Sequence, residues 1–136
     1  MGSHRSLILA RNRIFLLAEG IGGDAEIGSG GGFLALFDGA ARAVRAAELM
    51  DRSVADLGVR VRFGVHAGEV EVAGGQARGV AVHAAARVAS LAGPGEVLVS
   101  GTTHDLLEGS GLSLEPRGEH ELKGLSGARS IFALRR

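Results

Sequence analysis

Short apolar segments alternate along this chain with stretches of helical periodicity, and this alternation limits the possible folds more than any other feature. Residues 33–37 (FLALF) are apolar on both faces and lie between turn residues, which predicts a buried strand. Residues 40–57 then repeat apolar side chains at helical spacing, with Asp38 as the expected N-cap and Gly58 as the expected C-terminal glycine. Strands and helices in this order indicate an α/β or α+β domain with one sheet.

The rest of the chain continues the pattern. Residues 59–66 (VRVRFGVH) alternate apolar and other side chains, which predicts a strand, and residues 69–79 (EVEVA, then GGQARG) predict the arm and tip of a hairpin or a projecting loop. Residues 79–92 predict a second helix that ends at a Gly-Pro-Gly sequence. The remaining expected elements are a buried strand, a short helix and two final strands, at 96–100, 103–109, around 118–124 and at 129–135.

The composition limits the class of protein. The chain has 136 residues, enough for one core and too few for two. Its formal net charge is zero, so we expect no nucleic-acid partner, and its apolar runs are far shorter than the ~20 residues of a membrane span, so we expect no membrane contact. The absence of cysteine excludes disulfides and thiolate chemistry and leaves the cytoplasm as the default location.

The N-terminal segment allows two interpretations. Residues 1–5 resemble a cloning remnant, since no signal-peptide core follows Met-Gly-Ser-His, and we expect a single domain over residues 6–136. Residues 6–21 fit a helix with an apolar face, whereas the run RIFLLAE at 13–19 fits a central strand. Periodicity does not decide between the two for so short a run.

A glycine-rich run, GSGGG at residues 28–32, precedes the strand at 33–37. A P-loop would need a following lysine and a helix, and a dinucleotide fingerprint would need a strand before it and a helix after it. Because a strand follows here, we predict a hairpin turn in which glycine supplies the positive φ angles.

The histidines do not form a recognisable metal site. His66, His83 and His104 lack the spacing of a metal-binding motif. His83 and Arg87 are four residues apart on the second helix and therefore share a face. Taken alone, each is more often a solvated or packed residue than a catalytic one.

Four segments in order resemble the catalytic domain of class III adenylyl/guanylyl cyclases, particularly actinobacterial ones. The segments are GFLALFDG…ARAVRAA, VRVRFGVHAGEVE, GVAVHAAARVASLAGPGEVLVS and RGEHELKG. The resemblance implies a ferredoxin-like α/β core, with a central sheet and helices, that dimerises head to tail with active sites at the interface. Members convert ATP or GTP to the cyclic 3′,5′-monophosphate, and two aspartates hold two Mg²⁺ or Mn²⁺ ions.

The metal positions depart from the family pattern. Where the family has G-D-G-F, this chain has GGGF, with Gly31 at the aspartate position. The second aspartate belongs to an F-x-D-I-x-G strand. Either residues 14–24 are that strand and Glu19 replaces the aspartate, or residues 6–21 are the preceding helix and the first strand is absent. We favour the second alignment because it needs no internal deletion, although loss of a central strand would leave a row of backbone hydrogen-bonding groups without partners.

The resemblance places the other site residues on the facing half of the family's active site. Arg87 matches the arginine that stabilises the transition state, and His83 stands at the position of the ribose-orienting asparagine. The base-selecting pair falls on Ile27 and Gln76. The phosphate-binding lysine matches Lys123, the only lysine of the chain.

The resemblance therefore implies a degenerate cyclase-homology domain, shortened at its N-terminus and catalytically silent as a homodimer, that serves as a regulatory or dimerisation module or a scaffold. No cofactor is expected for the domain alone. In a second hypothesis the chain is half of a heterodimer whose partner cyclase domain supplies the aspartates and with them Mg²⁺ or Mn²⁺. A third hypothesis is a sensor that binds ATP or GTP without chemistry.

Overall fold

A computed structural model describes residues 2–11, 24–27, 33–58, 60–73, 76–122 and 125–135; for residues 2–33 and 70–78 within these ranges it describes the backbone. The helices are α1 (Ala40–Ala55), α2 (Val80–Leu91) and α3 (Gly101–Leu106). The strands are β1 (Gly2–Arg11), β2 (Asp24–Ile27), β3 (Phe33–Phe37), β4 (Arg62–Ala73), β5 (Gln76–Arg78), β6 (Val97–Ser100), β7 (Leu114–Glu121) and β8 (Ala128–Leu134). They form one eight-stranded sheet in the order β2-β3-β1-β4-β6-β8-β7, with β5 paired to β4. The expected mixed fold with a central sheet is confirmed.

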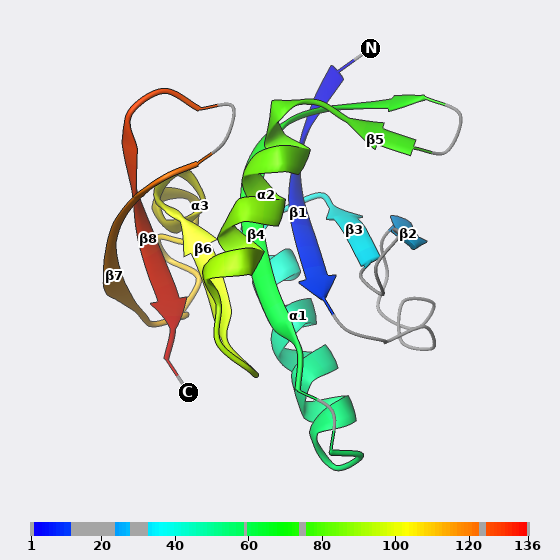
Figure 1. Cartoon of the computed structure of the whole chain (residues 1–136), viewed down its shortest axis with the longest axis vertical. Helices are drawn as coiled ribbons and strands as arrows, with labels where there is room; N and C mark the ends of the chain where they lie inside the picture. Colours follow the sequence, from blue (N-terminus) through cyan, green and yellow to red (C-terminus); the bar gives the residue numbers. More distant parts are fainter. Residues whose placement is uncertain are drawn as a thin grey trace.

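The first strand lies in the middle of the sheet, and the favoured sequence alternative, a helix from residue 6 with no first strand, is wrong. Residues 2–11 pair antiparallel with β3 on one side and with β4 on the other (Figure 1). Residues 6–11 are therefore a strand and not the start of a helix, whereas of residues 14–24 only Asp24, the first residue of β2, lies within the described part of the chain. The physical reason is that β3 and β4 each need a partner for their backbone groups, and the apolar run at 6–10 supplies it. Residues 2–5, set aside as a remnant above, form the first part of this strand.

The glycine-rich run connects two antiparallel strands, as predicted. Asp24 pairs with Leu36, and Ile27 pairs with Phe33, so β2 and β3 are neighbouring antiparallel strands. The residues of the turn itself, including Gly31, lie outside the described part of the chain.

The two longer helices cover opposite faces of the sheet (Figure 1). Phe63 and Val65 of β4 belong to the core cluster that contains the buried face of α1. The alternate residue Gly64 faces α2, where an added Cβ atom would lie 2.2 Å from the backbone nitrogen of Ala89. Leu34 and Leu36 of β3 pack with alanines of α2 on this second face.

Helix α1 begins at Ala40, as predicted, but its N-cap lies one residue later than predicted. Its N-cap is Gly39, with a φ of 154°, and not Asp38 as predicted. The backbone carbonyl of Gly39 accepts the first helical hydrogen bond, from the amide of Ala43 at 3.1 Å. Gly58 has a φ of 78°, as expected for a glycine that follows a helix.

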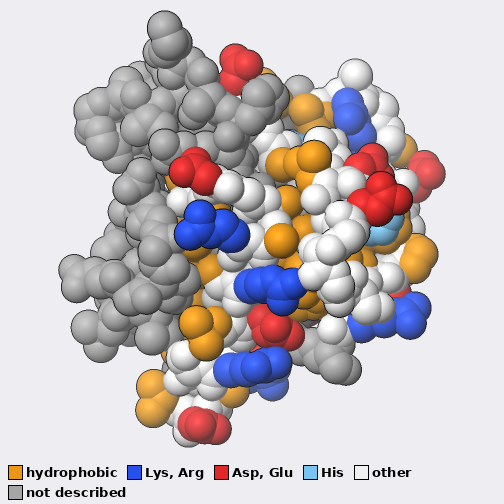
Figure 2. All heavy atoms as spheres, turned by 180° about the vertical axis from the view of Figure 1, so that it is seen from behind, with side chains coloured by type: hydrophobic (Ala, Val, Ile, Leu, Met, Phe, Trp, Pro, Cys, Tyr) orange, Lys and Arg blue, Asp and Glu red, His pale blue; other side chains and the backbone are white. Residues whose placement is uncertain are grey.

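The surface of the described residues shows no one-sided charge on the face that carries α1. Figure 2 shows arginines, carboxylates and apolar side chains interspersed over this face. Within the part of the chain that the structure describes, no helix has both the length and the hydropathy to cross a membrane.

Candidate functional site

Helix α2 presents His83 and Arg87 to solvent. Its buried face consists of small residues that sit on the sheet, namely Ala81, Ala84, Ala85, Val88 and Ala89. His83 and Arg87 lie on the opposite face and are exposed, and neither makes an ion pair with another described residue. Val80 and Leu91, at the two ends of the same face, are 49% and 38% exposed. The exposed face of α2 therefore combines a cation and an imidazole with apolar side chains, a composition suited to contact with another molecule.

The position of α2 depends on glycines of β4. An added Cβ atom at Gly64 would lie 2.7 Å from the carbonyl oxygen of Ala85, and one at Gly68 would lie 2.8 Å from the Cβ atom of Ala81. Only glycine permits so close an approach of a helix to a strand. Gly64 and Gly68, on either side of His66 along one face of β4, thus set the distance between α2 and the sheet. This distance in turn sets how far Arg87 projects from the sheet.

The structure places the other predicted site residues less completely. Ile27 is the last residue of β2 and Gln76 is the first residue of β5, and the description of both is of the backbone. Gly31, Glu19 and Lys123 lie outside the described residues. The structure brings together only His83 and Arg87 from the predicted set.

The strand at the centre of the sheet contains no acidic residue. From Gly2 to Ala18 the chain has neither aspartate nor glutamate, and β1 ends instead at Arg11. The register places Arg11 directly opposite Arg62 of β4, one residue beyond the pair of Ala10 with Phe33. Hard divalent cations need oxygen ligands, above all carboxylates. The described residues contain no group of three or more His, Cys, Asp or Glu side chains that could hold a metal ion.

A buried polar network lies on the α2 face of the sheet, next to this strand. The imidazole Nδ1 of His66 hydrogen-bonds the hydroxyl of Ser100 at 2.7 Å, and Ser100 hydrogen-bonds the hydroxyl of Thr103 at 3.0 Å. The backbone amide of Ala67 donates to Thr103 Oγ1 at 2.9 Å. All three side chains are at least nine-tenths buried. The network fixes α3 to the middle of β4 and to the end of β6.

The surroundings of His66 favour its neutral form. Burial, and secondly the guanidinium of Arg129, lower the pKa of His66 from its ordinary value of 6.5. The sequence analysis missed the network because Ser100 lies 34 residues from His66 in the chain. The signal that could have found it is the serine between a buried strand and a short helix, a preferred N-cap residue.

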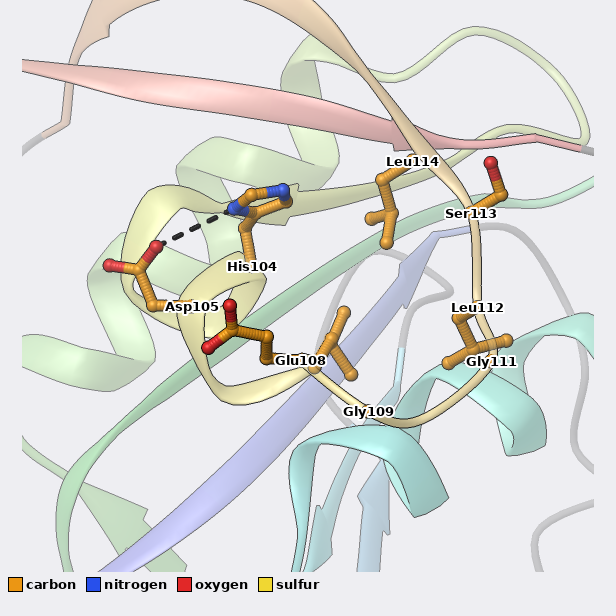
Figure 3. A pocket seen from close by; sticks show the side chains of 9 residues that line it. His104, Asp105, Glu108, Gly109, Gly111, Leu112, Ser113 and Leu114 are labelled. Carbon is orange, nitrogen blue, oxygen red and sulfur yellow. Dashed lines mark ion pairs between the residues drawn. The ribbon is translucent and has the colours of Figure 1, made fainter.

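A polar cavity of about 470 Å³ lies between α3 and the segment 109–114 (Figure 3). Figure 3 shows His104 Nδ1 directed at the carboxylate of Asp105, an ion-pair distance of 3.5 Å, with Glu108 on the same helix end. The ring of His104 stacks on Phe132, with 3.8 Å between the ring centroids. This cavity is separate from the face that carries His83 and Arg87.

The family model for the adenylate and guanylate cyclase catalytic domain matches residues 40–135 of the chain. This match covers more than half of the sequence. The chain belongs to the class III adenylate and guanylate cyclase catalytic domain family. The matched residues include α2 and the His66 network, and they begin after β1, β2 and β3.

Solved structures of cyclase domains share the fold over the whole chain. An adenylate/guanylate cyclase/hydrolase from Silicibacter pomeroyi aligns with a TM-score of 0.83 at 18% identity, over 98% of this chain and 97% of that chain. The adenylyl cyclase CyaB from P. aeruginosa aligns with a TM-score of 0.79 at 17% identity, over 100% and 96%. The non-canonical dimeric guanylyl cyclase domain of the RhoGC fusion protein from the aquatic fungus Blastocladiella emersonii aligns with a TM-score of 0.81 at 14% identity, over 98% and 97%. No curated protein sequence matches the chain.

The comparisons therefore support the N-terminal strands as part of the cyclase fold even though the family model does not reach them. At these identities the likeness to solved structures concerns the fold alone. The expectation of a class III cyclase domain is confirmed.

Proposed function

We propose that this chain is a cyclase-homology domain without the metal-binding aspartates of its family, catalytically silent by itself, and that it acts as a regulatory or dimerisation module. The observation that carries the proposal is the central strand β1, which contains no carboxylate and ends at Arg11. Matching the F-x-D element of the family motif to Leu9-Ala10-Arg11 puts an arginine at one aspartate position, and Gly31 stands at the other.

An arginine at this position does more than remove a metal ligand, because it also adds a positive charge. A guanidinium never deprotonates in proteins and would repel a divalent cation at short range. Arg62, directly opposite in the register, adds a second positive charge at the same end of the sheet. Loss of a single electrostatic contribution to a transition state costs about 10²–10³ in rate, and here both metal positions depart from the family pattern.

A cyclisation assay tests the proposal. ATP and GTP are each incubated with the domain and Mn²⁺, beside a metal-competent class III cyclase as positive control. We expect no cyclic nucleotide above the level of a protein-free blank. Turnover that Arg87→Ala removes, and that the matched variant Arg52→Ala on α1 leaves unchanged, would end the proposal.

The exposed face of α2 supports a second candidate function, a complementing half in a dimer with another cyclase domain. His83 and Arg87 are free of ion pairs among the described residues, and Val80 and Leu91 flank them as exposed apolar side chains. A partner domain would supply both aspartates and the Mg²⁺ or Mn²⁺ that they bind, while this chain gives Arg87, His83 and Lys123. Mixing with a metal-competent domain tests this function. The absence of both association and Arg87-dependent activity would exclude it.

Binding of ATP or GTP without turnover stays a third candidate, tested by calorimetry with and without Mg²⁺. Ile27 and Gln76, at the base-selecting positions, lack the lysine and aspartate of the family, so we expect little discrimination between the two bases. We place the domain in the cytoplasm, where these nucleotides are available.

A further inference from the structure

A cavity separate from the exposed face of α2 and from the cavity of Figure 3 opens beside the His66 network. It has a volume of about 320 Å³ and lies among β6, β8, the start of α3 and the turn that follows β7. Cavities that hold small ligands begin at about 300 Å³. Its polar lining consists of His66, Ser100, Thr102, Asp105, Arg129 and Ser130.

Most of these polar groups are hydrogen-bond donors. Arg129 donates through Nε to the backbone carbonyl of Ser126 at 3.2 Å, which orients its guanidinium and leaves its terminal nitrogens for another acceptor. No described carboxylate forms an ion pair with Arg129. The hydroxyls of Thr102 and Ser130 can donate as well.

The one carboxylate of the lining, Asp105, does not neutralise this charge. Its side chain is 85% exposed and forms an ion pair with Nδ1 of His104 at 3.5 Å, so it stands at the rim. Arg129 is therefore the charged group that acts on the buried His66 from β8. Helix α2 faces this part of β4 with apolar Ala81 and Ala85.

The Arg129 guanidinium and the buried His66 imidazole have no described carboxylate between them. Such an environment favours the binding of an anion. An oxyanion could accept from Arg129 in the bidentate geometry that guanidinium favours and from the hydroxyls around it. A bound anion would also offset the charge of Arg129 at His66.

We propose that this cavity is a binding site for a tetrahedral oxyanion of the phosphate class, with Arg129 as its charged ligand and His66 as the group that couples binding to protonation. The inference goes beyond the proposed function, because it holds whether or not the domain forms cyclic nucleotide. It concerns residues outside those that the family resemblance assigns.

The first experiment is a titration of the ¹⁵N-labelled chain with inorganic phosphate at constant ionic strength, followed by NMR. We expect saturable shifts at Ser100, Arg129 and Ser130. Arg129→Gln should weaken binding about ten-fold, the loss expected for one charge-assisted contact. Arg135→Gln removes the same charge from the end of the same strand and should leave binding unchanged.

Two outcomes overturn the proposal: no saturable shift around the cavity, or an equal loss of binding in Arg129→Gln and Arg135→Gln, which would indicate nonspecific attraction. Arg129 is partly exposed, so its variant should fold, and thermal unfolding checks this. If the Arg129 variant does not fold, the titration of the wild-type chain still tests the proposal.

A second arm uses sulfate, whose charge does not change between pH 5 and pH 8. Because an anion favours the protonated form of His66, sulfate should bind more tightly as the pH falls and should raise the pH at which the His66 ring titrates. Affinity that does not depend on pH would overturn the role of His66.

A third arm compares inorganic phosphate with ATP without metal, to distinguish a free oxyanion from the end of a nucleotide. Shifts at Arg129 with phosphate alone identify the free ion, and shifts with both identify a phosphate group in general. Failure of this arm, with no shift from either, leaves the cyclisation assay of the proposed function unaffected.

Discussion

The N-terminal strands β1 to β3 (residues 2–37) and the C-terminal region from α1 onward (residues 40–135) differ in what each shares with the cyclase family. The C-terminal region matches the family model and presents Arg87 on an exposed helix. The N-terminal region lies outside that match, yet β1 occupies the centre of the sheet. Apolar strands with paired backbones are enough to maintain a fold, whereas metal chemistry needs particular carboxylates. On the function proposed above, the fold is shared where the metal chemistry is not.

The largest expected effect comes from removal of β1. Deletion of residues 2–11 would leave β3 and β4 without their common partner, because β1 pairs with β4 along its whole length and with β3 over residues 6–10. We expect complete loss of the cooperative unfolding transition, followed by circular dichroism. A variant that keeps a wild-type transition would show that the N-terminal region is not structurally required.

Gly64→Ala tests the contact between β4 and α2, which lies within the C-terminal region. An added methyl group would meet the backbone of α2 at Ala85 and Ala89, which cannot move without displacing the helix. We expect a loss of about 3 kcal/mol in the free energy of unfolding, measured with denaturant. Gly93→Ala is the control, since a Cβ atom added there would lie 3.8 Å from its nearest neighbour. An equal loss of stability in this variant would contradict the account.

His66→Gln tests the buried network of the C-terminal region. Because the pKa of His66 is lowered in the folded chain, the unfolded chain takes up the proton first, and stability falls as the pH drops below 6.5. The variant should lose about 1 kcal/mol above that pH from the broken hydrogen bond and should show a weaker fall below it. His120→Gln, on β7, should retain the wild-type profile in urea denaturation; a fall of equal size in both variants would count against the network.

The smallest effect is expected at the surface of the C-terminal region. Arg117 pairs with Glu96 but is 45% exposed, so solvent screens the pair. Arg117→Ala should change the free energy of unfolding by less than about 1 kcal/mol. A larger loss, measured by the same denaturation, would show that this edge of the sheet contributes more than its exposure indicates.

Much of the C-terminal region could be predicted from the sequence, and the start of the chain could not. Residues 80–91 and 97–100 carry local signals, namely helical spacing and a bounded apolar run, and the shared face of His83 and Arg87 follows from their spacing. The strand at 2–11 carries only a short apolar run, and it is specified by pairing with β3 and β4, which are distant in sequence. The contact of His66 with Ser100 is also long-range, so no local pattern indicates it.

The most direct test of the central claim is a Mn²⁺ titration followed by electron paramagnetic resonance, on the wild-type chain and on the double variant Arg11→Asp/Gly31→Asp. The account predicts that an excess of wild-type protein leaves the free Mn²⁺ signal unchanged, whereas the double variant, which restores carboxylates at both positions, reduces it. Stoichiometric Mn²⁺ binding by the wild-type domain would contradict the account.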